Sequence, residues 1–162
     1  AGLYGSGLIG YIVVNVLLYI TVGIEEELMF RSVVTECVLR KNSNIIVFAS
    51  LYSGLLFGLA HITNFIFDAD MIMFNKWCTM IMACVFGFTL AVIFLRTKSI
   101  GAVITLHFLW DFADFMNHMM IVERYRYGGS YNALALQIPV LIVMLVIAVF
   151  CMYKRQMRLQ SV

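Results

Sequence analysis

Three groups of ionisable side chains interrupt segments of this sequence that are otherwise apolar. The first group lies in GIEEELMFRS (residues 23–32), the second is the histidine of FGLAHITN (57–64), and the third lies in LHFLWDFADFMNHM (106–119). Ionisable side chains are costly inside a membrane, and where they occur they are candidates for function with partners inside the helix bundle. Glutamate, histidine and aspartate from separate helices are together suited to activating a water molecule for hydrolysis.

The glutamates of the first group divide into a paired acid and a free one. Glu27 and Arg31 are four residues apart with the acid on the N-terminal side, which is the favourable arrangement for an ion pair on a helix. Glu26 is rotated by about 100° from Glu27 around the helix axis, so the pair leaves Glu26 available as a base. Glu25 has a second interpretation, because a carboxylate at the start of a helix also complements the helix dipole at the membrane interface.

The third group forms one polar face of a helix. Its members follow the spacing i, i+4, i+7 and i+11: His107, Asp111, Asp114 and His118. This spacing places them on one side of the helix, and such a stripe must face other helices or a water-filled cavity rather than lipid. His118, near the end of its segment, is expected at the interface rather than in catalysis. His61 taken alone would also suit a plain interhelical hydrogen bond.

The composition places these groups in an integral membrane protein. The 162 residues are 63% hydrophobic and 12% charged, with a mean hydropathy of +0.95, whereas soluble domains average roughly 45–50% apolar and about 25% charged residues. We expect a single membrane domain over residues 1–162, in contact with the lipid bilayer. The net charge of +2 and the lack of a long Lys/Arg run predict no nucleic-acid partner.

Long apolar runs predict an all-α, polytopic membrane bundle of about six helices with an intramembrane active site. A membrane-spanning helix needs about 20 predominantly apolar residues, and the runs are too long and too little alternating for barrel strands. The second run is short and the most polar, which leaves an incomplete crossing open. The expected helices are 7–23, 24–40, 44–67, 71–96, 99–121 and 133–153.

Basic residues between these helices predict the orientation. They gather in three breaks that the helix count places on one side: Arg40/Lys41, Arg96/Lys98 and Lys154/Arg155/Arg158. The positive-inside rule then puts the C-terminus in the cytoplasm, with the basic residues of ERYR (123–126) as the exception.

Small residues predict which helices pack most closely. They recur every four positions in two neighbouring segments, as Ser50, Gly54 and Gly58 and as Ala83, Gly87 and Ala91. Such stripes let helix backbones approach each other in lipid, so we expect the third and fourth segments to pack tightly and hold nearby polar groups in place.

Three motifs resemble those of a known family. EELMFRS (26–32) is similar to the EExxxR motif of the CAAX protease and bacteriocin-processing family of intramembrane proteases, FGLAH (57–61) is similar to its FxxxH motif, and HFLWD (107–111) is similar to its HxxxN or HxxxD motif. Their order and spacing also fit, over a motif core of residues 23–112. The resemblance implies an all-helical membrane fold with its active site inside the bundle, below the membrane surface.

The resemblance also implies roles for the motif residues. Glu26 matches the glutamate taken as the general base, and His61 matches the histidine that helps to position the water. Glu27 and Arg31 match the supporting second glutamate and arginine of the first motif. His107 matches the third-motif histidine, which with its partner four residues later is implied to stabilise the oxyanion.

Two positions depart from the family pattern. Ser32 stands where glycine is usual, a small-for-small change expected to be tolerated. Asp111 stands where asparagine is common, and an ionised aspartate cannot donate a hydrogen bond to an oxyanion. Either Asp111 is protonated, or it orients His107, which then donates; the second option needs no unusual protonation state and is preferred.

The expected function is therefore that of an intramembrane endopeptidase acting on a membrane-associated or lipidated peptide. A glutamate-activated water without cofactor is favoured over a zinc enzyme, in which Glu26, His61 and His107 would hold the metal with water in the fourth position; nothing in the sequence matches HExxH. Two non-enzymatic functions remain open for the same residues. One is a membrane immunity protein that binds a peptide without cutting it, and the second is a proton or ion relay.

Overall fold

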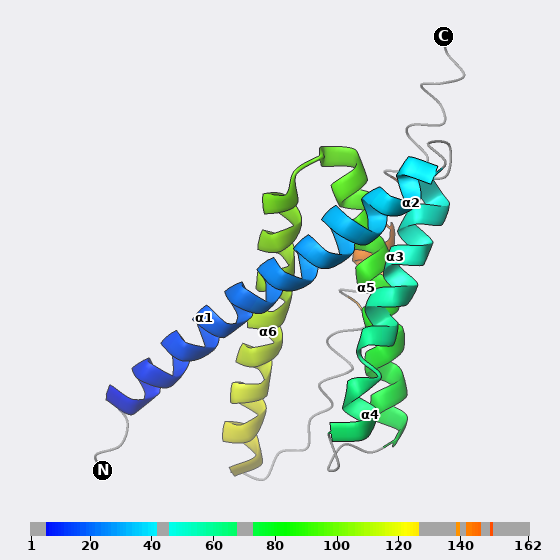
Figure 1. The fold of residues 1–162 in the computed structure, drawn as a ribbon. Helices are drawn as coiled ribbons and strands as arrows, with labels where there is room; N and C mark the ends of the chain where they lie inside the picture. Colours follow the sequence, from blue (N-terminus) through cyan, green and yellow to red (C-terminus); the bar gives the residue numbers. More distant parts are fainter. Residues whose placement is uncertain are drawn as a thin grey trace.

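The structure, a computed structural model, describes residues 6–41, 46–67 and 73–126, with the helical positions 139, 142–146 and 150. These residues form helices and no strands, as expected for an all-helical membrane protein. The helices are α1 (Ser6–Glu27), the π-helix η1 (Leu28–Thr35), α2 (Glu36–Lys41), α3 (Ile46–Ala60), α4 (Thr63–Phe67), α5 (Met73–Thr97) and α6 (Ile100–Arg126) (Figure 1). Most of the expected helix 133–153 lies outside the described residues, so a count of six is not confirmed.

The first two expected helices are one continuous helix, so the predicted break at residues 23–24 is wrong. The backbone stays in the α-helical region where α1 meets η1, with φ −69° and ψ −37° at Glu27, and again where η1 meets α2 at Glu36. The reason is local: Gly23 alone does not end a helix, and the following Glu, Leu, Met and Arg residues are good helix formers. The first motif therefore lies in mid-helix.

The helix changes from α to π directly after the glutamates, at Leu28. π-segments usually appear as short insertions in α-helices, frequently at functional sites. The carbonyl oxygen of Phe30 accepts hydrogen bonds from the hydroxyls of Thr35, at 2.8 Å, and of Ser53 on α3, at 3.2 Å. The second bond fastens η1 to α3, the helix that carries the second motif.

Helices α3 and α5 pack through the predicted small residues and run side by side in Figure 1. A Cβ added to Gly54 would lie 2.6 Å from the backbone nitrogen of Phe88, and one added to Gly87 would lie 2.8 Å from Cβ of Phe57. Both separations are too short for real atoms, so only glycine permits this approach. The predicted close packing of the third and fourth segments is confirmed.

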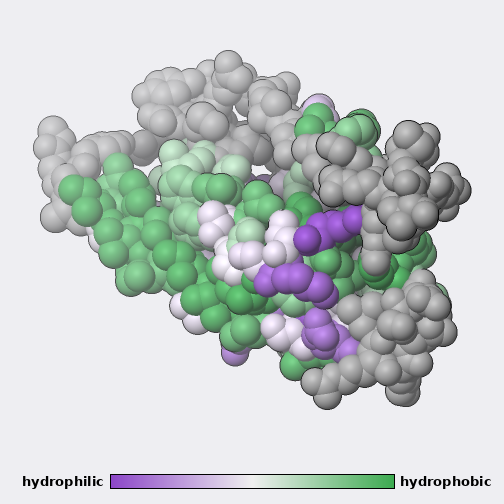
Figure 2. All heavy atoms as spheres, turned by 90° about the horizontal axis from the view of Figure 1, so that it is seen from above, coloured by the Kyte–Doolittle hydropathy of each residue, from purple (hydrophilic) through white to green (hydrophobic). Residues whose placement is uncertain are grey.

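Three described helical stretches are long and apolar enough to cross a membrane: Gly7–Val38, Ile46–Phe67 and Lys76–Thr97. Figure 2 shows a mostly apolar surface, with hydrophilic side chains gathered in one part of the view. Helix α6 is more polar, and it packs against α1 and α5, with Val103, His107 and Phe115 buried. Its polar face is thereby turned toward the other helices, at least at His107.

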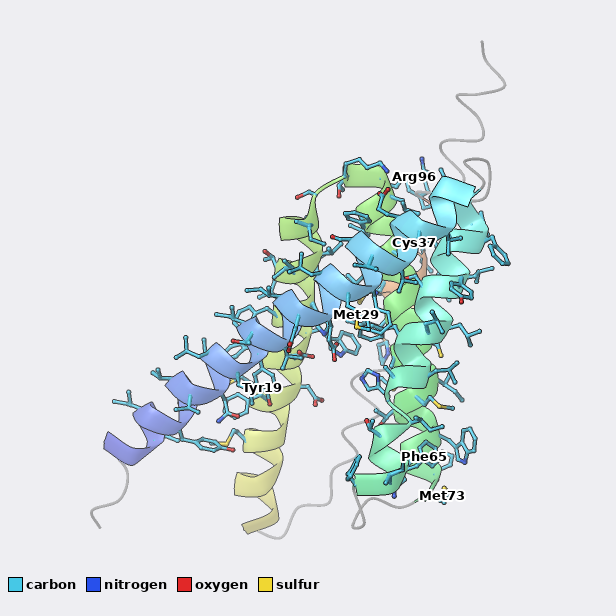
Figure 3. The ribbon with its side chains drawn as sticks, in the orientation of Figure 1. Tyr19, Met29, Cys37, Phe65, Met73 and Arg96 are labelled. Carbon is cyan, nitrogen blue, oxygen red and sulfur yellow. The ribbon has the colours of Figure 1, made fainter. Side chains whose placement is uncertain are left out.

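The ends of the bundle agree with part of the expected orientation. Arg96, at the end of α5, lies at the same end of the bundle as Cys37 in α2 (Figure 3), which matches the helix count between the first two basic breaks. The basic residues at 154–158 lie outside the described residues, so the side on which the C-terminus lies stays a prediction.

The glycine contact between α3 and α5 can be tested by adding one methyl group. Gly54→Ala forces the two helices apart and should lower the free energy of unfolding by about 1–3 kcal/mol, the usual range for overpacking. Thermal unfolding in detergent measures the change. The matched control is Gly10→Ala on α1, where an added Cβ meets nothing within 4 Å. Equal melting temperatures for the two variants would contradict this packing.

Candidate active site

Glu27 and Arg31 form the predicted ion pair, and both side chains are fully buried (0% exposed). Nη2 of Arg31 donates to Oε1 of Glu27 at 2.9 Å, and Nε lies 2.7 Å from Oε2 as a charge contact without hydrogen-bond direction. The guanidinium carbon also lies 5.0 Å from the ring centre of Phe57 on α3, a favourable cation–π arrangement. The pair thus fixes the first motif against the second.

His107 completes this buried cluster from α6. Its Nδ1 lies 2.8 Å from Oε1 of Glu27, and because an ionised carboxylate only accepts, Nδ1 carries the donated proton. Its Nε2 lies 3.6 Å from Oε2 of Glu26 and 3.6 Å from Oδ2 of Asp111. Both separations are too long for direct hydrogen bonds. Glu27 is therefore the residue that orients the ring, whereas the sequence had suggested Asp111 for that role.

Glu26 lies beside this cluster but remains accessible. Its side chain is 34% exposed, in contrast to Glu27 one position later. The two carboxylates face opposite nitrogens of the same imidazole, Glu27 at Nδ1 and Glu26 at Nε2. This is the division into a bound acid and a free acid that the helical spacing predicted. Solvent can therefore reach the carboxylate of Glu26 but not that of Glu27.

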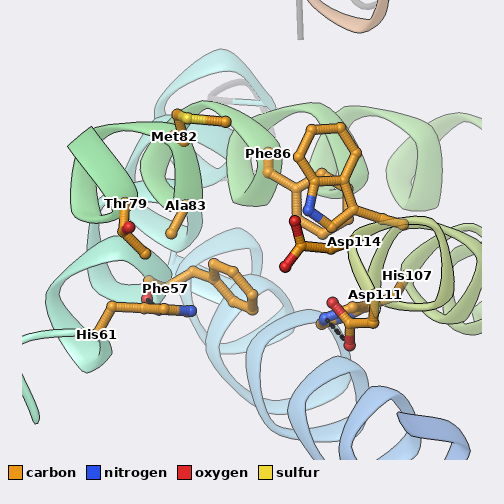
Figure 4. Close-up of a pocket in the computed structure, with 10 residues that line it drawn as sticks. Phe57, His61, Thr79, Met82, Ala83, Phe86, His107, Asp111 and Asp114 are labelled. Carbon is orange, nitrogen blue, oxygen red and sulfur yellow. Dashed lines mark hydrogen bonds and ion pairs between the residues drawn. The ribbon is translucent and has the colours of Figure 1, made fainter. Parts of the chain in front are cut away.

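His61 follows the last residue of α3, at the turn into α4. Its Nδ1 lies 3.0 Å from the carbonyl oxygen of Phe57, so Nδ1 donates and Nε2 is the nitrogen left for other partners. Figure 4 shows the ring reaching into a cavity that His107 and Asp111 also line. The second and third motifs therefore meet at one cavity.

This cavity has a volume of about 270 Å³ and lies between α3, α5 and α6. Its lining residues are Phe57, His61, Thr79, Met82, Ala83, Phe86, His107, Trp110, Asp111 and Asp114. Glu26 is not among them; it approaches the Nε2 atom of His107 from α1. The carboxylates of Glu26 and of the cavity-lining Asp111 thus lie near the same atom, Nε2 of His107.

Sequence reasoning missed the aromatic wall of the cavity. Phe86 lies with its ring centre 5.3 Å from that of His107 and 5.0 Å from that of Trp110. Trp110 lies about one helical turn after His107, so its place in the cavity wall could have been predicted from this spacing. No local pattern marks Phe86 or Thr79 as lining residues. Ser32, the departure from the family glycine, is exposed. The side chain of His118 lies outside the described part of the structure.

Comparison with known protein families identifies the chain. A model of type II CAAX prenyl endopeptidases, Rce1-like, matches residues 8–113, which include all three motifs. The chain belongs to this family. It is a family of membrane proteases, so its activity class agrees with the predicted one, and the family suggested by the motifs is confirmed. No curated protein and no solved structure matches the chain.

The side chains as arranged do not fit the zinc site considered from the sequence. Among the described residues, no three His, Cys, Asp or Glu side chains are grouped so that they could hold a metal ion. Of the three expected ligands, His61 and His107 line the cavity, and Glu26 does not.

The contribution of the buried ion pair between Glu27 and Arg31 to stability can be tested by an isosteric substitution of the acid. Glu27→Gln leaves Arg31 charged and buried without its partner, and breaking one side of a buried ion pair typically costs about 3–5 kcal/mol. We expect a corresponding loss of stability in chemical or thermal unfolding. Glu25→Gln, two positions earlier on the exposed side of α1, is the control and should unfold like the parent protein. A stable Glu27→Gln variant would show that the pair does not hold the fold.

Proposed function

We propose that the protein is an intramembrane endopeptidase that hydrolyses a membrane-associated or lipidated peptide through a water molecule activated by Glu26. The observation that carries the proposal is the position of His107, with Nε2 facing the accessible carboxylate of Glu26 at 3.6 Å and the ring lining a cavity shared with His61. Membership of a membrane protease family supports it.

In the proposed reaction Glu26 takes a proton from a water molecule as its oxygen attacks the peptide carbonyl carbon, and then passes that proton to the leaving amine. His61 holds the water through Nε2. No covalent intermediate with the enzyme forms. The tetrahedral intermediate carries a negative oxygen, which needs a donor at the opposite side of the carbon.

His107 is the proposed donor to that oxygen. Its Nδ1 proton is committed to Glu27 at 2.8 Å, so donation from Nε2 requires the doubly protonated ring, whose charge the carboxylates of Glu26 and Asp111 balance, each 3.6 Å from Nε2. One donor of this kind typically contributes about 2.7–4 kcal/mol to transition-state stabilisation. Asp111, 3.6 Å from Nε2, limits the positions that the ring and the bound carbonyl can take.

The site's surroundings support a substrate drawn from the membrane. The first two motifs lie in stretches that are long and apolar enough to span it, and aromatic and aliphatic side chains form much of the cavity wall. A peptide held at the bilayer by a lipid or an apolar segment would reach such a site more readily than a soluble one. By the distribution of basic residues, we propose a cytoplasmic C-terminus.

Removal of the proposed base tests the reaction. Glu26→Gln keeps the size of the side chain but cannot accept the proton, so cleavage of membrane peptides should fall by about 10²–10⁴-fold, the usual contribution of general base catalysis. Cleavage is measured by mass spectrometry with the purified protein, beside His61→Ala. Glu25→Gln is the control and should retain activity. Unchanged biological function in a Glu26→Gln variant would instead favour a protein that binds a peptide without cutting it.

Chelation tests the choice between the glutamate mechanism and a zinc-dependent one. With Glu26 as base and His107 as donor, incubation with EDTA followed by its removal should leave the cleavage rate unchanged, and added zinc should not raise it. The rate is followed with one peptide and one protein preparation before and after chelation. Loss of cleavage that zinc restores would contradict the metal-free mechanism.

A further inference from the structure

The hydrogen bond to Glu27 fixes one atom of His107 but not the plane of its ring. Nδ1 lies 2.8 Å from Oε1 of Glu27, whereas Nε2 lies 3.6 Å from the carboxylates of Glu26 and Asp111, too far for hydrogen bonds. The torsion that turns an imidazole about its Cβ–Cγ bond has a broad distribution. The direction of Nε2, on which the proposed reaction depends, therefore needs a further restraint.

Two phenylalanine rings pack against this imidazole from other helices. The ring centre of Phe86 on α5 lies 5.3 Å from that of His107 with an interplanar angle of 80°, and the ring centre of Phe57 on α3 lies 5.7 Å away at 66°. Aromatic rings prefer such separations and steep angles. The two phenyl rings are themselves 6.2 Å apart, so the three rings form one cluster at the cavity (Figure 4).

Helix α6 contacts Phe86 at two positions. The ring centre of Trp110 lies 5.0 Å from that of Phe86, and Trp110 follows His107 by three residues, so the two side chains are neighbours on the surface of α6. Phe86 is also buried, with 3% of its surface exposed. Through Phe86, helix α5, which carries none of the three motifs, contacts the imidazole.

Phe86 can be tested more cleanly than Phe57. Phe57 also lies 5.0 Å from the guanidinium of Arg31, and its carbonyl oxygen accepts a hydrogen bond from His61. A change at Phe57 would therefore disturb the ion pair and both histidines together, whereas the described polar contacts of the cluster do not involve Phe86.

We propose that Phe86 is a positioning residue, whose ring holds the imidazole of His107 so that Nε2 points at the reacting carbonyl of the substrate. The role rests on the proposed peptidase function, and Phe86 itself makes and breaks no bond. Without the phenyl ring, His107 keeps its partner Glu27 but takes a wider range of orientations. The rate then falls, because a donor stabilises the negative oxygen only when it is aligned with it.

Kinetics of Phe86→Leu test this role. The change keeps an apolar side chain but removes the ring, so kcat for cleavage of a membrane peptide should fall about tenfold, a part of the 10²–10³-fold cost of losing a whole oxyanion donor, while KM stays unchanged. The control is Phe94→Leu, the same change two turns further along α5 at a buried core position that does not line the cavity. It should retain kcat.

The same kinetics distinguish the alternatives. A raised KM with unchanged kcat would make Phe86 part of the wall that binds substrate, and an equal fall of kcat in Phe86→Leu and Phe94→Leu would make it an ordinary core residue. Either result would overturn the proposal. Phe86→Met, which is closer in volume to the parent side chain, replaces Phe86→Leu if the latter does not fold.

A measurement without substrate separates this proposal from the peptidase function. The chain has three histidines, so nuclear magnetic resonance of protein labelled with ¹⁵N-histidine in detergent gives few ring signals, and His107→Gln identifies those of His107. The Nδ1 proton bound to Glu27 should exchange with water at least about fivefold faster in Phe86→Leu than in the parent or in Phe94→Leu, because the ring opens more often. Equal exchange rates in all three would overturn the proposal. Faster exchange in a protein that cleaves no peptide would contradict the peptidase alone.

Discussion

The contact between Glu27 and His107 holds the site together. It joins α1 to α6 at 2.8 Å inside a fully buried cluster, and it is possible only because Arg31 neutralises the acid from one turn further along the same helix. A buried carboxylate without a partner would be strongly unfavourable. The contact sets the direction of the imidazole, and with it the position of Nε2 in front of Glu26. The family glutamate pair thus has two distinct tasks, one acid fixing the ring and the other facing its free nitrogen.

The remaining helices hold the second motif and the cavity against this cluster. Gly54 and Gly87 bring α3 and α5 so close that any larger residue would clash, while the hydroxyl of Ser53 ties α3 to the π-helix at the carbonyl of Phe30. Phe57 lies beneath Arg31 and beside both histidines. Close backbone packing is therefore what allows polar groups from separate helices to meet around one cavity of about 270 Å³.

Local features of the site were predictable because they depend on helical spacing alone. The pairing of Glu27 with Arg31 and the close packing at Gly54 follow from residues four apart, and the motif order indicated the family. The partner of His107 was not predictable in this way, since Glu27 is 80 residues away in the chain and Asp111 was the nearer candidate in sequence. The continuous helix through Gly23 was also missed, because glycine in a membrane helix is as compatible with close packing as with a break. The aromatic wall at Phe86 depends wholly on tertiary packing.

A double-mutant cycle between Glu27 and His107 tests this arrangement most directly. In the first cycle the free energy of unfolding is measured for the parent, Glu27→Gln, His107→Gln and the double variant. In a parallel cycle His107→Asn replaces His107→Gln, because the amide nitrogen of asparagine lies at the same number of bonds from the backbone as Nδ1 of histidine. The account predicts a coupling energy of at least about 1 kcal/mol in the first cycle, and a smaller one in the second because the asparagine still reaches Glu27. Free energies that add to within about 0.5 kcal/mol in the first cycle would show that the two side chains do not touch, and would contradict the site as described.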